Sequence, residues 1–139
     1  MESIFTIKIV AAHEHMPEHY QPYYQGHRAL QLLDQSDNIR GELVWRLATG
    51  NSAEITEFGL YNVSDRRKGW GSRLLQEAIS DITLYFQQYN FHLRRIYLFC
   101  EERNEIARKF YELHGFCLSA TLTDFYIDND ALLYIKILP

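Results

Sequence analysis

The feature that most constrains this chain is a change of hydrophobic period across a glycine-containing loop near its middle. Residues 53–63 (AEITEFGLYNV) have the pattern of a strand, whereas from Ser72 to about Asn90 apolar residues recur at helical spacing. The run RRIYLFC, residues 94–100, then has the composition of a buried strand. Because successive strand, helix and strand form a right-handed crossover, the sequence predicts a locally parallel pair of strands.

Antiparallel strands are expected on both sides of this unit, with turn-forming segments such as QSDN and DND between them. They are expected at residues 3–10, 28–34, 39–48, 118–127 and 131–138. A second helix is predicted near residues 104–114, capped by Gly115. The first helix should keep Asp81 on its polar side. The prediction is therefore one domain over residues 1–139, of α/β (α+β) class, with a mixed, mostly antiparallel sheet and helices on both faces.

Composition argues against several classes of function. The formal net charge is −4, so no basic field favours nucleic acid. No uninterrupted apolar stretch approaches the roughly 20 residues of a membrane helix. The two cysteines, Cys100 and Cys117, without a signal peptide, are typical of reduced thiols in a cytoplasmic protein, and both are expected in the core.

The loop SDRRKGWGSRLL, residues 64–75, has the features of an anion site. A helix N-terminus offers free main-chain N–H groups and a positive dipole end, and Gly69 and Gly71 let the backbone approach a ligand closely. Arg66, Arg67 and Lys68 add positive charge, so a phosphate or pyrophosphate would fit. The alternative is a tight turn with solvated basic residues.

Two nucleotide motifs fail at this loop. No GxxxxGK[ST] string occurs, and Leu74 stands where the dinucleotide fingerprint needs a third glycine. The pattern that remains is [RQ]xxGx[GA], matched by Arg66, Gly69 and Gly71 between a strand and a helix.

The second predicted helix carries a family resemblance. NEIARKFYELHGF, residues 104–116, resembles the N-x-x-A-x-x-x-Y-x-x-x-G-F segment of the GCN5-related N-acetyltransferase (GNAT) superfamily. The glycine loop is similar to that family's acetyl-CoA pyrophosphate loop, and the likeness covers about residues 39–139. It implies direct transfer of an acetyl group from acetyl-CoA to a primary amine of a small molecule or peptide, with no metal. A homodimer remains open.

The resemblance also implies roles for individual residues. The end of the fourth strand would hold the pantetheine arm, the loop the pyrophosphate, and Tyr111 would protonate the departing thiolate. Gly59 is expected to mark a bulge that opens the fourth strand away from the fifth. The implied cofactor-binding residues are Leu60, Tyr61, Asn62, Val63, Arg66, Arg67, Lys68, Gly69, Trp70, Gly71, Ser72, Asn104, Ala107 and Tyr111.

The general base stays open between Glu54, Glu57 and a chain of water molecules. A base is needed because the attacking amine must be neutral. The two glutamates are separated by an odd number of residues, so on a regular strand they would point to opposite faces, although a bulge would change that. Neither cysteine has a histidine beside it in these motifs, which disfavours a covalent intermediate.

The segment AAHEHMPEHYQPYYQGH, residues 11–27, stands where the family usually has two helices. Pro17 and Pro22 break a helix, and the histidines and Glu18 match no standard zinc spacing. We expect a loop or short helical turn that covers the acceptor site. Two alternative functions remain: a CoA-binding sensor or partner protein without catalysis, and a phosphate-binding module unrelated to CoA.

Overall fold

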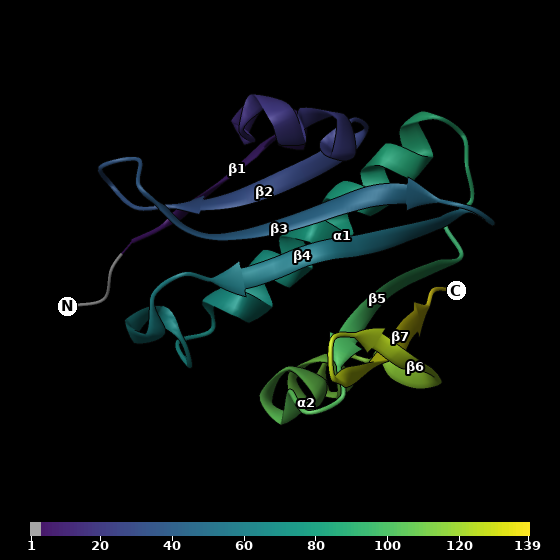
Figure 1. Ribbon diagram of the computed structural model, residues 1–139. Coiled ribbons are helices and arrows are strands. Elements are labelled where there is room, and N and C mark those ends of the chain that lie inside the picture. The colour runs from purple at the N-terminus through teal and green to yellow at the C-terminus, as the bar shows by residue number, and fades with distance from the viewer. Residues whose placement is uncertain (1–3) are drawn as a thin grey trace.

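The computed structural model describes residues 4–139, which form one seven-stranded sheet in the order β1-β2-β3-β4-β5-β7-β6 (Figure 1). The strands are β1 (Thr6–Ala11), β2 (His27–Leu33), β3 (Ile39–Ala48), β4 (Ser52–Leu60), β5 (Arg95–Glu101), β6 (Cys117–Tyr126) and β7 (Asn129–Ile137). The helices are α1 (Trp70–Gln88) and α2 (Glu105–Leu113), with the short 3₁₀ helices η1 (Ala12–His15), η2 (Glu18–Tyr24) and η3 (Val63–Asp65).

Within residues 4–139, β4 and β5 pair in parallel, and the other five pairs of neighbouring strands are antiparallel. The predicted fold class and the parallel pair are therefore confirmed. The expected first strand began at residue 3, which lies outside the described residues. No helix within residues 4–139 is long and apolar enough to cross a bilayer.

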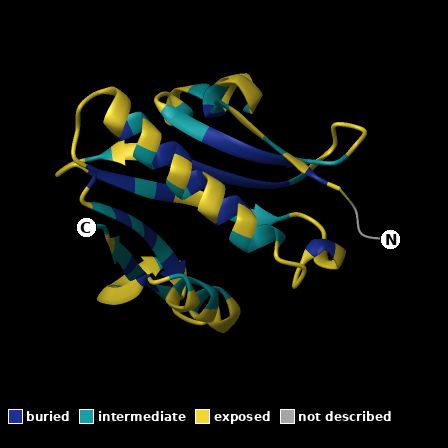
Figure 2. Ribbon diagram, turned by 180° about the vertical axis from the view of Figure 1, so that it is seen from behind, coloured by how far each residue is buried: buried dark blue, intermediate teal, exposed yellow. Residues whose placement is uncertain are grey.

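One large core lies on the face of the sheet that α1 and α2 cover. Figure 2 shows α1 crossing this face with exposed residues on its outer side. Phe110 and Tyr111 of α2 pack against the same cluster from the other helix. Its buried members include Leu74, Leu75, Ala78 and Ile82 of α1 together with Leu43, Trp45, Ile55, Ile96, Leu98 and Tyr134 of the strands.

The opposite face carries η1 and η2, in the segment expected to hold short helical turns. Ala12, Ala29 and Val44 form a small buried cluster there, against which Tyr24 packs. Pro22 lies inside η2, so this stretch takes 3₁₀ turns rather than the α-helix that proline disfavours.

A bulge in β4 corrects the expectation for Gly59. Val44 of β3 pairs with Glu57 while Trp45 pairs with Ile55, so Thr56 is the extra residue. The Thr56 hydroxyl donates to the Val44 carbonyl at 3.3 Å. Parallel pairing with β5 ends one residue earlier, at Ile55 and Leu98, so the strands diverge at the bulge and not at Gly59.

Two further expectations were wrong. Cys100 is buried, but Cys117 is exposed, because it lies on β6, an edge strand of the sheet.

The other concerns Asp81, which is only 7% exposed. It accepts hydrogen bonds from Arg28 at 2.8 and 3.0 Å and from the Trp45 indole at 3.0 Å. It follows Ala78 by one turn on the inner face, so a buried ion pair stands where a solvated carboxylate was predicted.

Removing the Asp81 carboxylate should destabilise the fold strongly. Asp81→Ala leaves a guanidinium and an indole N–H without their shared acceptor, so we expect the free energy of unfolding to fall by about 3 kcal/mol. Glu77→Ala, at an exposed position on the same helix, should change it by less than about 0.5 kcal/mol. Chemical denaturation measures both, and equal losses would contradict a structural role for Asp81.

Candidate active site in the gap between two strands

The site is built around the gap that opens where β4 leaves β5. Beyond Ile55 and Leu98 the two strands no longer pair with each other. At its far end β4 runs through η3 and the glycine loop into α1, and β5 leads directly into α2. The divergence therefore brings the loop, the start of α1 and one face of α2 to the same end of the sheet (Figure 1).

The N-terminus of α1 presents uncapped main-chain donors. Gly69 is the N-cap residue, has a φ of +87° in the left-handed region and makes no side-chain cap, and the first turn carries no acidic residue. The first helical hydrogen bond runs from the Arg73 N–H to the Gly69 carbonyl at 3.0 Å. The N–H groups of Trp70, Gly71 and Ser72 therefore have no acceptor within the helix, which is the arrangement that binds an anion.

The loop before this helix is anchored by a buried ion pair that sequence analysis missed. Arg40, in β3, donates to both carboxylate oxygens of Asp65 at 2.9 and 3.0 Å, and Asp65 is 3% exposed. The Arg40 guanidinium also lies 5.3 Å from the Phe5 ring centroid. The Phe5 ring in turn contacts the Trp70 ring at 4.8 Å. The Trp70 side chain thus helps to fix the loop, and its main-chain N–H remains at the helix terminus.

The remaining loop residues keep space for a ligand. Arg66, Arg67 and Lys68 are exposed. A Cβ added at Gly69 would meet no atom of the described chain within 4 Å, and at Gly71 it would reach the Phe110 ring at 3.7 Å, an ordinary contact. At Gly69, therefore, only the positive φ disfavours other residue types. At position 71, the Phe110 ring of α2 limits the size of a side chain.

Strand β4 ends earlier than expected. This changes which main-chain N–H and carbonyl groups a pantetheine arm could use. The strand ends at Leu60 instead of residue 63, and the Tyr61 N–H donates to the Arg40 carbonyl at 2.8 Å. The carbonyls of Asn62 and Val63 accept from Asp65 and Arg66 within the η3 turn. The strand-like main chain beside the gap therefore belongs to residues 56–60.

Tyr111 reaches the gap from α2. Its ring centroid lies 6.3 Å from that of Phe58 on β4, and Cys100 of β5 is close enough to influence its titration. Burial is the main cause that raises the pKa of the Tyr111 hydroxyl above its ordinary value, with the nearby thiol adding to it. The hydroxyl has no hydrogen-bond partner in the described chain, but it is not sealed from solvent. It is therefore a protonated donor beside the gap at neutral pH.

The other residues expected on α2 have structural contacts of their own. Asn104 caps the helix, because its Oδ1 accepts from the Ala107 N–H at 3.2 Å. Its side-chain N–H₂ group remains free of partners within residues 4–139. Ala107 packs against the main core on the same face as Tyr111.

The bulge places the two candidate bases on one face. Ile55 and Phe58 both pack toward the main core although they are separated by an odd number of residues. Glu54 and Glu57 therefore both point to the opposite face, the one that carries η1 and η2. Arg46 contacts Glu54 at 2.6 Å. Glu57 lies beyond the last parallel pair, at the start of the gap, and accepts a hydrogen bond from the Tyr24 hydroxyl.

Tyr24 and Glu42 complete this face, and neither was predicted as a site residue. The hydrogen bond to Glu57 is the main cause that raises the pKa of Tyr24 to about 12, so the phenol stays protonated at neutral pH. Glu42 is buried, and burial is the main cause that raises the pKa of its carboxyl, while Gln31 donates to it at 3.3 Å. The only sequence signal for Tyr24 was the density of tyrosine and histidine in residues 13–27.

The histidines of that segment do not gather into a metal site. Within residues 4–139, no three side chains of the histidine, cysteine, aspartate and glutamate types lie close enough together to hold a metal ion. Glu18 and His19 belong to η2, whereas His13 and His15 belong to η1.

The comparisons with known proteins agree with this geometry. Residues 11–116 match the model of the Acetyltransferase (GNAT) family, which is most of the chain. The protein therefore belongs to the GNAT family of acetyltransferases. No curated protein matches it.

Several solved structures share the fold over nearly the whole chain. An IAA acetyltransferase from Bacillus cereus aligns with a TM-score of 0.81 at 14% identity, covering 97% of this chain and 100% of its own. A Bacillus subtilis acetyltransferase in complex with CoA has a TM-score of 0.79 at 15% identity, covering 98% and 100%. A GNAT acetyltransferase from Elizabethkingia anophelis with acetyl-CoA bound has a TM-score of 0.75 at 16% identity, covering 96% and 98%. At these identities the likeness is one of fold.

The loop can be tested with two glycine variants of matched backbone strain. Gly69 and Gly50 have φ values of +87° and +78°, and at neither position would an added Cβ meet a main-chain atom within 4 Å. Alanine should cost each site about 1 kcal/mol of stability. Gly69→Ala should weaken CoA binding about ten-fold or more because the N–H groups beside it would be reoriented, whereas Gly50→Ala should not. Calorimetric titration with CoA measures this, and equal affinities would remove the loop from cofactor binding.

Proposed function

We propose that the protein transfers the acetyl group of acetyl-CoA directly to a primary amine of a small molecule or peptide. The observation that carries this proposal is the position of Tyr111 and Glu57 on either side of one gap. Tyr111 meets β4 through Phe58 on the face of the main core, and Glu57 points to the opposite face. A thioester in the gap would have a proton donor on one side and a base on the other.

The chemistry then needs two proton transfers and no covalent enzyme intermediate. The amine nitrogen attacks the thioester carbonyl carbon, the new C–N bond forms and the C–S bond breaks. Glu57 takes the proton that the amine loses, and Tyr111 gives one to the thiolate. Cys100 does not suit a ping-pong route, because burial raises the pKa of its thiol and keeps it protonated.

The cofactor would lie with its pyrophosphate on the N–H groups of Trp70, Gly71 and Ser72. Its pantetheine arm would follow residues 56–60 of β4, where strand pairing is unused. The free N–H₂ group of Asn104 would contact it from α2. The route would end near Tyr111, because Tyr111 and its neighbour Phe110 both pack against Phe58 on β4, with ring centroids 6.3 and 5.6 Å away.

Glu57 is a better candidate for the base than Glu54. The Glu54 carboxylate already forms a salt bridge with the Arg46 guanidinium. Glu54 also lies opposite Tyr97, where β4 and β5 are still paired. Glu57 lies where the pairing has ended and is exposed. Its partner Tyr24 leaves one carboxylate oxygen available to an amine.

An acceptor screen tests the proposal as a whole. Purified protein is supplied with acetyl-CoA and a set of primary amines, and release of the CoA thiol is followed together with the mass of the acetylated product. Amine-dependent release with a matching product supports catalysis. CoA binding without turnover of any amine would favour the sensor function instead, and a cytoplasmic location stays a prediction in either case.

Replacing Tyr111 by Phe should lower kcat without loss of folding. The substitution keeps the ring that packs on Phe58 and deletes only the hydroxyl. We expect kcat to fall by about 10-fold to 10³-fold while the Kd for CoA is unchanged. Steady-state kinetics with the amine found in the screen measure this. A wild-type kcat, even with a donor whose thiol is a poor leaving group, would assign the proton to water or another residue.

Neutralising the two glutamates should separate their roles. Glu57→Gln should lower kcat about 10²-fold or more at neutral pH, because the amide cannot accept a proton. Glu54→Gln changes the matched carboxylate on the same face and should have a much smaller effect on kcat. Pre-steady-state acetyl transfer at several pH values tests both variants. If Glu54→Gln carries the larger loss, the base assignment is reversed.

A further inference from the structure

Two carboxylates on the face that carries η1 and η2 have no basic partner. The salt bridges found within residues 4–139 involve neither Glu42 nor Glu57. Glu42 is 8% exposed, and of its two carboxylate oxygens only Oε2 accepts a hydrogen bond, from Gln31. Its other oxygen therefore lacks a partner in the described part of the chain, although burying a carboxylate without a cation is costly.

The two carboxylates are neighbours on this face. Glu42 of β3 pairs with Gly59 of β4, and Val44 pairs with Glu57, so Glu42 and Glu57 are diagonal neighbours. Such neighbours lie about 7–8 Å apart along the sheet. Burial is the main cause that raises the pKa of the Glu42 carboxyl, and the charge of Glu57 adds to it. Two acidic groups thus face one region of the surface.

Open space lies beside them, above Gly59. A Cβ added at Gly59 would meet no atom of the described chain within 4 Å, and it would point to the same face as Glu42. Tyr24 borders this space through its hydrogen bond to Glu57. Burial, followed by the charges of Glu42 and Glu57, raises the pKa of the Tyr61 hydroxyl, so this phenol is also close to both carboxylates.

These groups match a positively charged ligand. Carboxylate oxygens accept strong hydrogen bonds from an ammonium group, and the faces of tyrosine rings attract it. An ammonium bound beside Glu42 would supply the partner that the chain does not, and would favour the ionised form of that carboxyl. The net charge of −4 also favours the approach of a cation.

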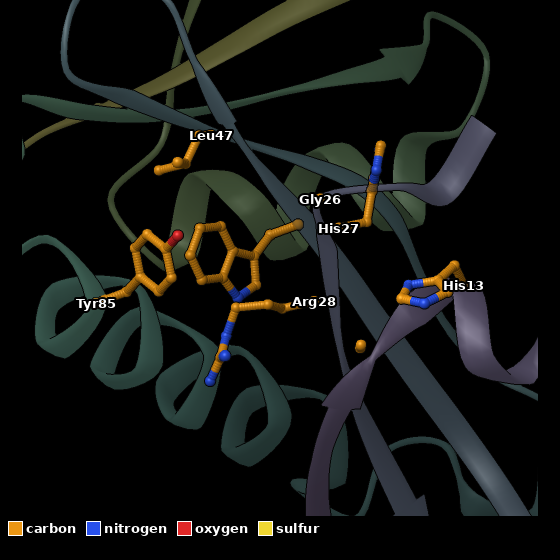
Figure 3. Close-up of a pocket in the computed structure, with 8 residues that line it drawn as sticks. His13, Gly26, His27, Arg28, Leu47 and Tyr85 are labelled. Atoms are coloured by element: carbon orange, nitrogen blue, oxygen red, sulfur yellow. The ribbon is translucent and has the colours of Figure 1, made fainter. Parts of the chain in front are cut away.

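A cavity at the other end of β3 differs in this respect. It has a volume of about 240 Å³ and lies between Tyr85 of α1 and His13 of η1 (Figure 3). The Arg28 guanidinium in its wall is neutralised by two hydrogen bonds to Asp81. The space above Gly59, by contrast, offers a ligand charged groups that have no counter-ion in the described chain.

We propose that the acceptor is a diamine or another amine with a second positive charge, and that Glu42 binds the ammonium group that does not react. The inference rests on the proposed acetyl transfer, in which Glu57 takes the proton of the reacting amine. The second nitrogen keeps its protons and its charge, and no bond to it forms or breaks. Glu42 is thus a residue that determines specificity, and a few methylene groups would span the distance between the two carboxylates.

Three amines with the same four-carbon chain test the charge at its far end. Putrescine, n-butylamine and γ-aminobutyrate carry an ammonium, a methyl group and a carboxylate there. Calorimetric titration of the CoA-loaded protein should show that putrescine binds about ten-fold or more tighter than n-butylamine, with γ-aminobutyrate the weakest. No binding of putrescine, equal affinities, or a preference for γ-aminobutyrate would overturn the proposal. Because the titration needs no turnover, this order of affinities without acetylation of any amine would contradict the proposed transfer and leave the cation site standing.

One variant and a matched control locate the charge that is responsible. Glu42→Gln keeps the shape of the side chain and removes its charge, so the ratio of putrescine to n-butylamine affinity should fall about ten-fold or more. Its melting temperature should not fall, because a buried charge without a counter-ion is lost. Glu18→Gln removes the same charge from an exposed position of η2 and should keep the wild-type ratio. An unchanged ratio in Glu42→Gln, or equal falls in both variants, would contradict the assignment.

Steady-state acetylation then separates binding from chemistry. Glu42→Gln should raise the KM for putrescine about ten-fold or more, while kcat changes by less than about three-fold. A loss of kcat with putrescine and n-butylamine alike would place Glu42 in proton transfer and overturn its assignment to acceptor binding.

Discussion

The arrangement of the candidate active site depends on the end of main-chain pairing between β4 and β5. Four residue pairs hold the two strands in parallel, and after Ile55 and Leu98 the hydrogen bonds stop. The extra residue at Thr56 turns the strand over at the same point. Phe58 therefore packs into the main core, while Glu54 and Glu57 share the opposite face. One irregularity thus opens the sheet and decides which side chains border the opening.

The glycine loop is held from both sides, which fixes the direction of the α1 N-terminus. On one side the Arg40–Asp65 ion pair links the loop to β3, and on the other Trp70 packs on Phe5. Binding an anion on main-chain amides requires donors that are already oriented, since ordering them on binding would consume part of the interaction energy. Aspartate and tryptophan in this loop thus act mainly through the backbone that they position.

Much of the fold could be predicted from the sequence because periodicity and turn residues are local signals. The change of period at Ser72, the run at residues 94–100 and the closing hairpin all correspond to observed elements. Asp81 was misplaced, because its partners Arg28 and Trp45 come from distant strands and no local pattern records a buried ion pair. The bulge at Thr56 instead of Gly59 has the same cause, since the register of β4 is set by β3.

Only those residues of the candidate site that belong to a sequence motif could be predicted. The loop and Tyr111 came from sequence patterns, and the structure brings them to one end of the sheet. The sequence analysis missed Tyr24, Glu42 and Arg46. These residues come near the two glutamates only through strand pairing and the bulge. The roles of all these residues in catalysis remain proposals.

The 3₁₀ helix η2 is held on the sheet by few buried contacts. This helix contains no buried residue, and of its seven residues Tyr24 packs on the small cluster beneath it. Separating η2 from the sheet would therefore expose little apolar surface and leave the β2–β3–β4 ladders intact. Regions of that kind open at a free energy well below that of global unfolding, and their amide hydrogens exchange early. The hydrogen bond from Tyr24 to Glu57 can thus be broken by a local fluctuation while the cofactor side of the molecule stays folded.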